Sequence, residues 1–420
     1  MTIPPPATAT ASGAAREPMP KPLKRLFGFI VPLNFAIYLS IGAIPGVLLP
    51  LQVQGIDETN KAANLAVVLG VGAVAAMIAS PVAGLISDRT RSRFGRRAPW
   101  LVGGALATGL ALIGMGLADG VVQLVIAWTI VQIAINFVIS PLTALMPDRV
   151  PVAVRGLFAT LLGLGSMFGA LGGQIFGAAF AQSIPAAYVV LPGVMLVAVV
   201  LFVVFCPDRS SKDRVNEPFS LAFFLKTFWV SPRRYPDFAW GFLGRLLLFT
   251  GYFAVTGYQL YILQDYIGLG DDAVATIPTL GVLSLAGMIV TMGFSGPLSD
   301  RLGRRKVFVI VASIVMGAAF VVPWVWPTLP GMMLFTVIAG LGFGCYMAAD
   351  GALMSEVLPS DSTYAKDLGV LNIAATLPQT VGPFLSGAIV VLLGYQALFP
   401  VGIVLALLGA LAIVPIKSVR

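Results

Sequence analysis

The sequence contains no histidine, and its 420 residues include only two cysteines and 10% charged residues. Soluble domains carry about 25% charged residues, and the mean hydropathy of +0.94 indicates more apolar surface than one aqueous core could hide. Without histidine or a cysteine cluster, we expect no metal site and no cofactor. Cys206 and Cys345 lie far apart in apolar runs, so both are predicted to be small buried hydrophobic residues.

Apolar runs make up most of the chain. A helix needs about 20 apolar residues to cross the ~30 Å hydrocarbon core of a bilayer. Twelve runs meet this requirement: 27–50, 63–87, 100–118, 122–146, 156–181, 188–206, 238–264, 274–298, 307–326, 330–350, 368–394 and 396–416. The 46 glycines suit closely packed membrane helices. The sequence therefore predicts an all-α membrane protein with twelve transmembrane helices.

The lysines and arginines fall almost entirely on one side of these runs. With the N-terminus in the cytoplasm, 24 of the 26 are cytoplasmic, the exceptions being Lys61 and Arg245. The positive-inside rule then predicts a multi-pass protein of the cell inner (cytoplasmic) membrane with both termini cytoplasmic. The net charge of +8 therefore reports topology, and no nucleic-acid partner is expected.

Two motifs recur at about half the chain length. GLISDRTRSRFGRR at 84–97 is echoed by GPLSDRLGRRK at 296–306, and ALMPDRVP at 144–151 by ALMSEVLP at 352–359. Both pairs fall after the second and fourth spans of a half, which predicts two parallel six-helix repeats. The expected divisions are a disordered tail at 1–25, bundles at 26–206 and 238–416, a linker at 207–237 and a cytoplasmic end at 417–420.

The repeated G-x-x-S-D-R…G-R-R motif resembles the major facilitator superfamily. SDRTRSRFGRRAPW and AKDLGVLNIAATLPQ at 365–379 are similar to plant sucrose transporters and the related glycoside–pentoside–hexuronide:cation symporters. The resemblance implies the major facilitator fold and alternating-access transport of a small solute, a sugar or glycoside moved with protons. Proton-coupled efflux of drugs or lipophilic metabolites and uncoupled facilitation stay open as alternatives. We expect a monomer in the lipid bilayer and no enzymatic activity.

The repeated motif is predicted to gate the cytoplasmic side. Clustered cations suit the negative end of a helix dipole and anionic lipid heads, so a simple topology signal is the alternative. The resemblance implies that Asp88 faces the start of the eleventh span, after Lys366, and symmetry places Asp300 near Arg155. The predicted gating residues are Asp88, Arg89, Arg96, Arg97, Asp300, Arg301, Arg304 and Arg305.

Few ionisable residues interrupt the spans, where they are costly and usually functional. Asp350, at the inner end of the tenth span, has no acidic counterpart in the first half and is predicted to couple transport to protons, paired with Arg245. A static ion pair, or a carboxylate in interfacial water, is the alternative. Asp265 is expected at an outer loop boundary. Spans 2 and 4 have no acidic residue before Asp88 and Asp148, so neither a sodium site of the melibiose-symporter type nor the proton-linked carboxylate of plant sucrose transporters is expected.

Polar and aromatic residues within the spans are candidates for binding the solute, because sugars present apolar faces and hydroxyl edges. Hydrogen bonding between helices is the alternative for any single amide. The candidates are Asn34, Tyr38, Gln132, Asn136, Gln174, Arg245, Tyr252, Tyr258, Gln259, Tyr346, Asn372 and Gln379.

Overall fold

The computed structural model describes residues 20–212, 233, 235–357 and 364–417, without the side chains of 297, 300, 352, 355–357 and 364–375. Over these residues the regular structure is entirely helical, and twelve helices are long and apolar enough to cross a membrane. The prediction of an all-α protein with twelve spans is confirmed.

The first six spans are built from ten helical elements. They are α1 (Lys21–Ala43), η1 (Ile44–Leu48), α2 (Leu49–Ile56), α3 (Lys61–Arg89), α4 (Ala98–Gly116), α5 (Val121–Thr143), α6 (Leu145–Arg149), η2 (Val152–Val154), α7 (Arg155–Ala179) and α8 (Ile184–Phe205).

The last six spans follow the same plan. They are α10 (Pro236–Thr256), α11 (Gln259–Tyr261), η3 (Ile262–Tyr266), η4 (Gly270–Asp272), α12 (Ala273–Leu302), α13 (Arg305–Val325), α14 (Leu329–Val357), α15 (Tyr364–Leu393), η5 (Tyr395–Ala397) and α16 (Leu398–Ile413).

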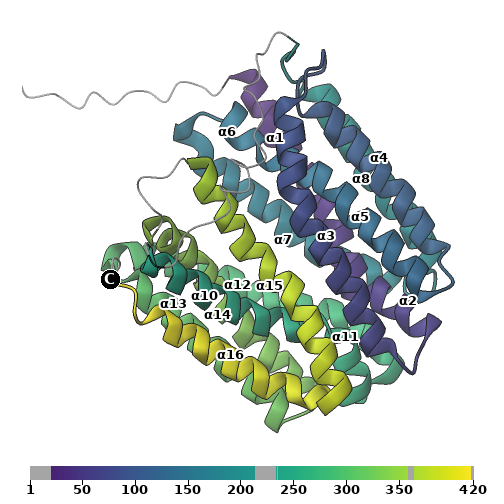
Figure 1. The fold of residues 1–420 in the computed structure, drawn as a ribbon, viewed down its shortest axis with the longest axis vertical. Helices are drawn as coiled ribbons and strands as arrows, with labels where there is room; N and C mark the ends of the chain where they lie inside the picture. Colours follow the sequence, from purple (N-terminus) through teal and green to yellow (C-terminus); the bar gives the residue numbers. More distant parts are fainter. Residues whose placement is uncertain (1–19, 213–232, 234, 358–363, 418–420) are drawn as a thin grey trace, which may run out of the picture.

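The helices pack as two groups (Figure 1). Helices α1 to α8 contact mainly one another, as do α10 to α16, and the main contacts between the groups join α3 to α15 and α7 to α12. We call the end of the bundle that carries Arg89 and Arg97 the arginine end, and the opposite end, which carries Tyr261, the tyrosine end. The domain limits given above stay a prediction.

The first and seventh spans are less regular than predicted. The run at 27–50 passes through the π-helical turn η1, which contains Pro45, and the run expected at 238–264 is interrupted after Thr256 before it continues through α11 and the π-helical turn η3. Proline removes a backbone donor and crowds the preceding turn, which accounts for the widened turn at η1. Single π-turns are frequent at functional sites.

Glycines let α7 lie directly against α1. A Cβ added at Gly169 would lie 2.6 Å from the carbonyl oxygen of Phe35, and one at Gly173 would lie 2.6 Å from the backbone nitrogen of Ala43. Both distances are shorter than real Cβ contacts. Small residues at a spacing of four are the usual means by which membrane helices approach backbone to backbone.

Candidate functional site

A cavity of about 130 Å³ lies between the two helix groups. The first group contributes Gly46, from the π-turn η1, and Gln174, from α7. The second group contributes the remaining lining, which mixes hydroxyl, amide and apolar side chains: Tyr252, Thr256, Gln259, Ile277, Leu280, Gly281, Ser284, Phe335, Thr336 and Ala339. Elements of both groups therefore have to meet for this cavity to exist.

Three of the predicted solute-binding residues, Gln174, Tyr252 and Gln259, line this cavity. The side-chain oxygen of Gln174 is buried and has no hydrogen-bond partner among the described residues. The Tyr252 ring is held in place by stacking on Phe343, at 4.7 Å between ring centroids. The cavity thus combines a fixed aromatic ring with an acceptor that is ready for a donor on a solute.

Contacts between the groups close the tyrosine end. The Tyr258 hydroxyl donates to the carbonyl oxygen of Ala62 at 2.7 Å, and the Tyr261 hydroxyl donates to that of Pro50 at 2.8 Å. Lys61 pairs with Asp265 at 2.9 Å. Tyr258, predicted to bind solute, is therefore engaged in closure and is not among the residues that line the cavity. Asp265 lies toward the expected end of its span, but its cross-group partner was not foreseen.

Arg245 and Asp350 form the expected ion pair, with 3.2 Å between Nη1 of Arg245 and Oδ2 of Asp350. The Asp350 side chain is 3% exposed and that of Arg245 is 13% exposed. Arg245 Nε is buried without a hydrogen-bond partner among the described residues, and the buried Tyr346 hydroxyl lies beside the Asp350 carboxylate. The pair lies outside the cavity lining, in the interior of the second group.

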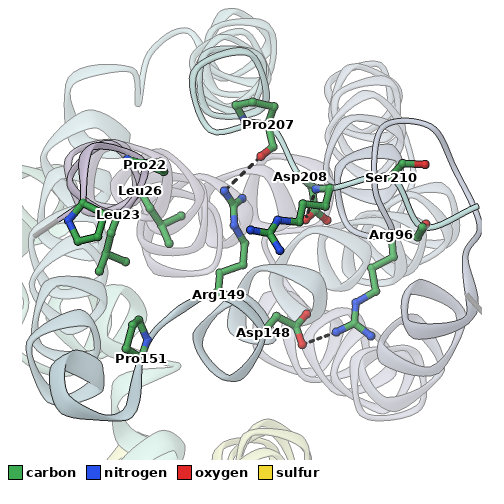
Figure 2. Close-up of a pocket in the computed structure, with 13 residues that line it drawn as sticks. Pro22, Leu23, Leu26, Arg96, Asp148, Arg149, Pro151, Pro207, Asp208 and Ser210 are labelled. Carbon is green, nitrogen blue, oxygen red and sulfur yellow. Dashed lines mark hydrogen bonds and ion pairs between the residues drawn. The ribbon is translucent and has the colours of Figure 1, made fainter.

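A charged network lies at the arginine end. Arg97, 3% exposed, donates to Ser87 and Asp88, each at 2.5 Å, and also pairs with Asp148 at 3.0 Å. Arg96 pairs with the same two carboxylates, and its contact with Asp148 is visible in Figure 2. Two arginines and two carboxylates thus tie the loop after α3 to α6.

This network contains part of the predicted gating set but lies wholly within the first helix group, so a gating role between the two groups stays a prediction. Asp88, Arg96 and Arg97 are brought together, and Arg301 and Arg304 are exposed at the end of the second group. Arg89 and Arg305 have interaction partners of their own. The side chain of Asp300, and those at the start of α15 expected to face Asp88, lie outside the described residues. Asp148 was not predicted as a gating residue, although its repeat position next to Arg149 was a usable signal.

The remaining solute-binding candidates do not converge on the cavity lining. Asn34 donates to the Leu162 carbonyl and to the Ser166 hydroxyl, and Asn136 donates to the Gln132 carbonyl. The bonds of Asn34 join α1 to α7, which is the alternative stated above, whereas the bond of Asn136 lies within α5. Tyr38 packs beside α7, Tyr346 against Phe249, and Gln379 is exposed with a partner of its own; the side chain of Asn372 lies outside the described residues.

The family model of the Major Facilitator Superfamily matches residues 30–294 and 274–419. The chain belongs to this superfamily. A solved structure of a D-xylose–proton symporter matches with a TM-score of 0.69 over 95% of this chain and 98% of that one, at 15% identity. At this identity the likeness shows the fold alone. That the protein is a transporter rests on its membership of the superfamily.

Sequence relatives of this major facilitator protein have different substrates. The glucose transporter GlcP of Staphylococcus epidermidis is 31% identical over 143 residues, which cover 34% of this chain and 30% of that protein. The multidrug efflux pump PmrA of Streptococcus pneumoniae is 23% identical over 392 residues, which cover 87% of this chain and 89% of the pump. Both sugar transport and drug efflux therefore occur among its relatives.

The pair of Lys61 and Asp265 gives a first test of closure at the tyrosine end. Replacing Lys61 with alanine removes a partly exposed ion pair worth about 0.2–1 kcal/mol, so the population that is open at the tyrosine end should rise by about 1.4- to five-fold. The measurement is the rate at which a water-soluble thiol reagent labels a Ser284→Cys cavity variant whose two native cysteines are replaced with alanine. Lys61→Arg, which keeps the charge, should label at the original rate, and equal rates in Lys61→Ala would contradict a closing role.

Proposed function

We propose that this major facilitator protein takes up a sugar or glycoside together with protons by alternating access, within the sucrose transporter and glycoside–pentoside–hexuronide symporter branch. The proposal also takes the arginine end to be cytoplasmic, in the cell inner membrane, as the positive-inside rule predicts. The observation that carries it is the polar and aromatic cavity between the two helix groups.

The lining of this cavity supports a sugar-like solute. Tyr252 offers a ring face, while Gln174, Gln259, Ser284 and Thr336 offer donors and acceptors for hydroxyl groups. Ligand sites combine such apolar walls with a few placed polar groups, and drug-sized ligands occupy about 300–1,000 Å³. The smaller volume here, about 130 Å³, favours a small polar solute.

Proton coupling is proposed to use Asp350, with Arg245 as its partner. An ionisable residue in a span is costly and marks a functional site by default. Arg245 can stabilise the charged carboxylate, and binding of a proton to Asp350 would release Arg245 from its only described ion pair. The second helix group would then have two arrangements, one with Arg245 paired to Asp350 and one with Arg245 released, and alternating access requires two such arrangements.

Efflux of a drug or lipophilic metabolite is the second candidate. The similarity to the pneumococcal efflux pump, which extends over 87% of this chain, favours this candidate. The two candidates differ in direction and in the solute, so one reconstituted system separates them.

The experiment measures uptake of a labelled panel of mono- and disaccharides into proteoliposomes with and without an inward proton gradient. We expect gradient-driven accumulation of one sugar. Gln174→Ala should raise the KM for that sugar about two- to ten-fold, since one neutral hydrogen bond is lost.

The matched control is Gln123→Ala, which removes an exposed glutamine at the start of α5 away from the cavity and should leave the KM unchanged. Equilibration of a sugar without accumulation would make the protein a facilitator. Expulsion of a lipophilic cation with no sugar movement would replace the uptake proposal with efflux.

A further inference from the structure

A second and larger pocket, of about 660 Å³, opens at the arginine end of the first helix group. Figure 2 shows its composition: Pro22, Leu23 and Leu26 of α1 on one side, Arg149 and Asp148 of α6 at the centre, and the segment after α8 opposite. It is separate from the solute cavity, with which it shares no lining residue. One wall is apolar and another is strongly charged.

The charged wall has an excess of positive charge. Its lining holds three arginines, Arg96, Arg149 and Arg209, against two carboxylates. Asp148 pairs with Arg96 and Arg97, and Asp208 accepts from the backbone N–H of Arg209 but keeps its charge, so the excess is one positive charge. Arg149 donates to the carbonyl oxygens of Cys206 and Pro207 at 2.9 and 3.2 Å, which fixes its position without neutralising it. Neither Arg149 nor Arg209 forms an ion pair with a described carboxylate. Arginine presents five donors in a planar fork that matches phosphate.

An apolar groove of about 510 Å³ lies further along the same two helices. It is lined by residues of α1 and α8: Phe29, Pro32, Phe35, Ala36, Gly193, Val194, Val197, Ala198 and Leu201. Val194 and Val197 are 40% and 59% exposed, so the groove opens at the lipid-facing surface of a membrane-spanning helix. The exposed Gly193 leaves room there, because a Cβ added to it would meet nothing within 4 Å.

The pocket and the groove follow each other along α1 and α8. On α1 the pocket ends at Leu26 and the groove begins at Phe29, a rise of about 4.5 Å. On the antiparallel α8 the groove ends at Leu201, and the pocket begins at Pro207. The Phe29 and Phe205 rings stack at 5.0 Å and form the apolar surface between them. An object with a charged head and an apolar tail would fit both at once.

We infer that this surface between α1 and α8 binds one anionic phospholipid from the leaflet at the arginine end. Arg149 and Arg209 hold its phosphate, and an acyl chain occupies the groove beside Gly193 and Val197. Charge complementarity and the position of the groove in the membrane both favour this occupant, since basic residues at the end of a membrane helix attract anionic lipids. The inference rests on membrane embedding and is independent of the transported solute.

The test is native mass spectrometry of the purified full-length protein titrated with phosphatidylglycerol or with phosphatidylcholine of the same acyl chains. Phosphatidylglycerol should bind first and more tightly. Arg209→Gln should weaken phosphatidylglycerol binding about five-fold and phosphatidylcholine binding less, because the choline cation already compensates the phosphate charge of that lipid. Gly193→Leu, which fills the groove, should weaken both lipids, while the matched variant Gly103→Leu, on an exposed face of α4 with equal space, should change neither.

Two results would overturn the inference. The first is that the two lipids bind with equal affinity and that neither Arg209→Gln nor Gly193→Leu changes that affinity. The second is displacement of phosphatidylglycerol by an equal concentration of soluble glycerol phosphate with no effect of Gly193→Leu, which would assign the arginines to a free phosphate compound. Arg209 is an exposed residue, so its variant tests the head site even if a groove variant folds poorly.

Discussion

Replacing Asp350 with asparagine is expected to abolish proton-driven accumulation of the solute while leaving solute exchange across the membrane measurable. Asparagine has nearly the same shape but cannot take up or release a proton, so the coupled step is lost while the solute can still bind and exchange. The measurement compares accumulation under an inward proton gradient with exchange of labelled for unlabelled solute in the same proteoliposomes. Asp119→Asn, in the exposed loop between α4 and α5, is the matched control and should accumulate solute normally.

The ion pair itself complicates this substitution and also provides its check. Removing one partner of a buried pair costs about 3–5 kcal/mol, because the other charge is left uncompensated. Asp350→Asn should therefore lower the thermal unfolding midpoint, and the double variant Arg245→Gln with Asp350→Asn should regain much of the loss. Full accumulation in Asp350→Asn would show that the pair of Arg245 and Asp350 is a static structural element and that coupling lies elsewhere.

Replacing Gly173 with leucine should prevent the first helix group from packing. The added Cβ would clash with the backbone of α1 at Leu39, Gly42 and Ala43. A flexible side chain could relieve such a clash by changing rotamer, but a helix backbone cannot. Overpacking a tight site costs about 1–3 kcal/mol when side chains can adjust, so a backbone clash should cost at least about 3 kcal/mol. The measurement is the yield of monodisperse protein in detergent together with its unfolding midpoint.

Gly163 provides the control for this substitution on the same helix. It is ten residues earlier on α7, and a Cβ there would meet nothing within 4 Å. Gly163→Leu should therefore give protein in normal yield with an unfolding midpoint close to that of the parent. If Gly173→Leu behaved like Gly163→Leu, α1 and α7 would not be in the direct backbone contact described here.

The span boundaries illustrate which parts of the fold can be predicted from sequence. The run expected at 63–87 is observed as α3, Lys61–Arg89, because an apolar run of sufficient length in a bilayer has to satisfy its backbone internally and forms a helix. The interruption after Thr256 in the seventh span was missed. Hydropathy averages over about twenty residues, and a single widened or broken turn changes that average too little to be detected.

The candidate solute-binding residues show what could not be predicted from sequence. Asn34 and Gln174 are both amides within apolar spans, and nothing in their neighbourhoods separates them. In the structure Asn34 donates to two groups on α7, whereas the oxygen of Gln174 is left without a described partner beside the cavity. Which role an amide takes depends on the helix packed against it, and that helix is distant in sequence.

The apolar runs and the placement of the arginines were sufficient by themselves to determine the class, the twelve spans and, through the repeated motif, the superfamily. Each of these properties follows from local composition, because the lipid bilayer stabilises long apolar helices. Only the tertiary structure decided that Gln174 lies with Tyr252, that Lys61 meets Asp265 and that α1 and α8 join a basic pocket to an apolar groove. Those relations depend on which helix faces lie together, and helix packing is set by contacts between residues far apart in the chain.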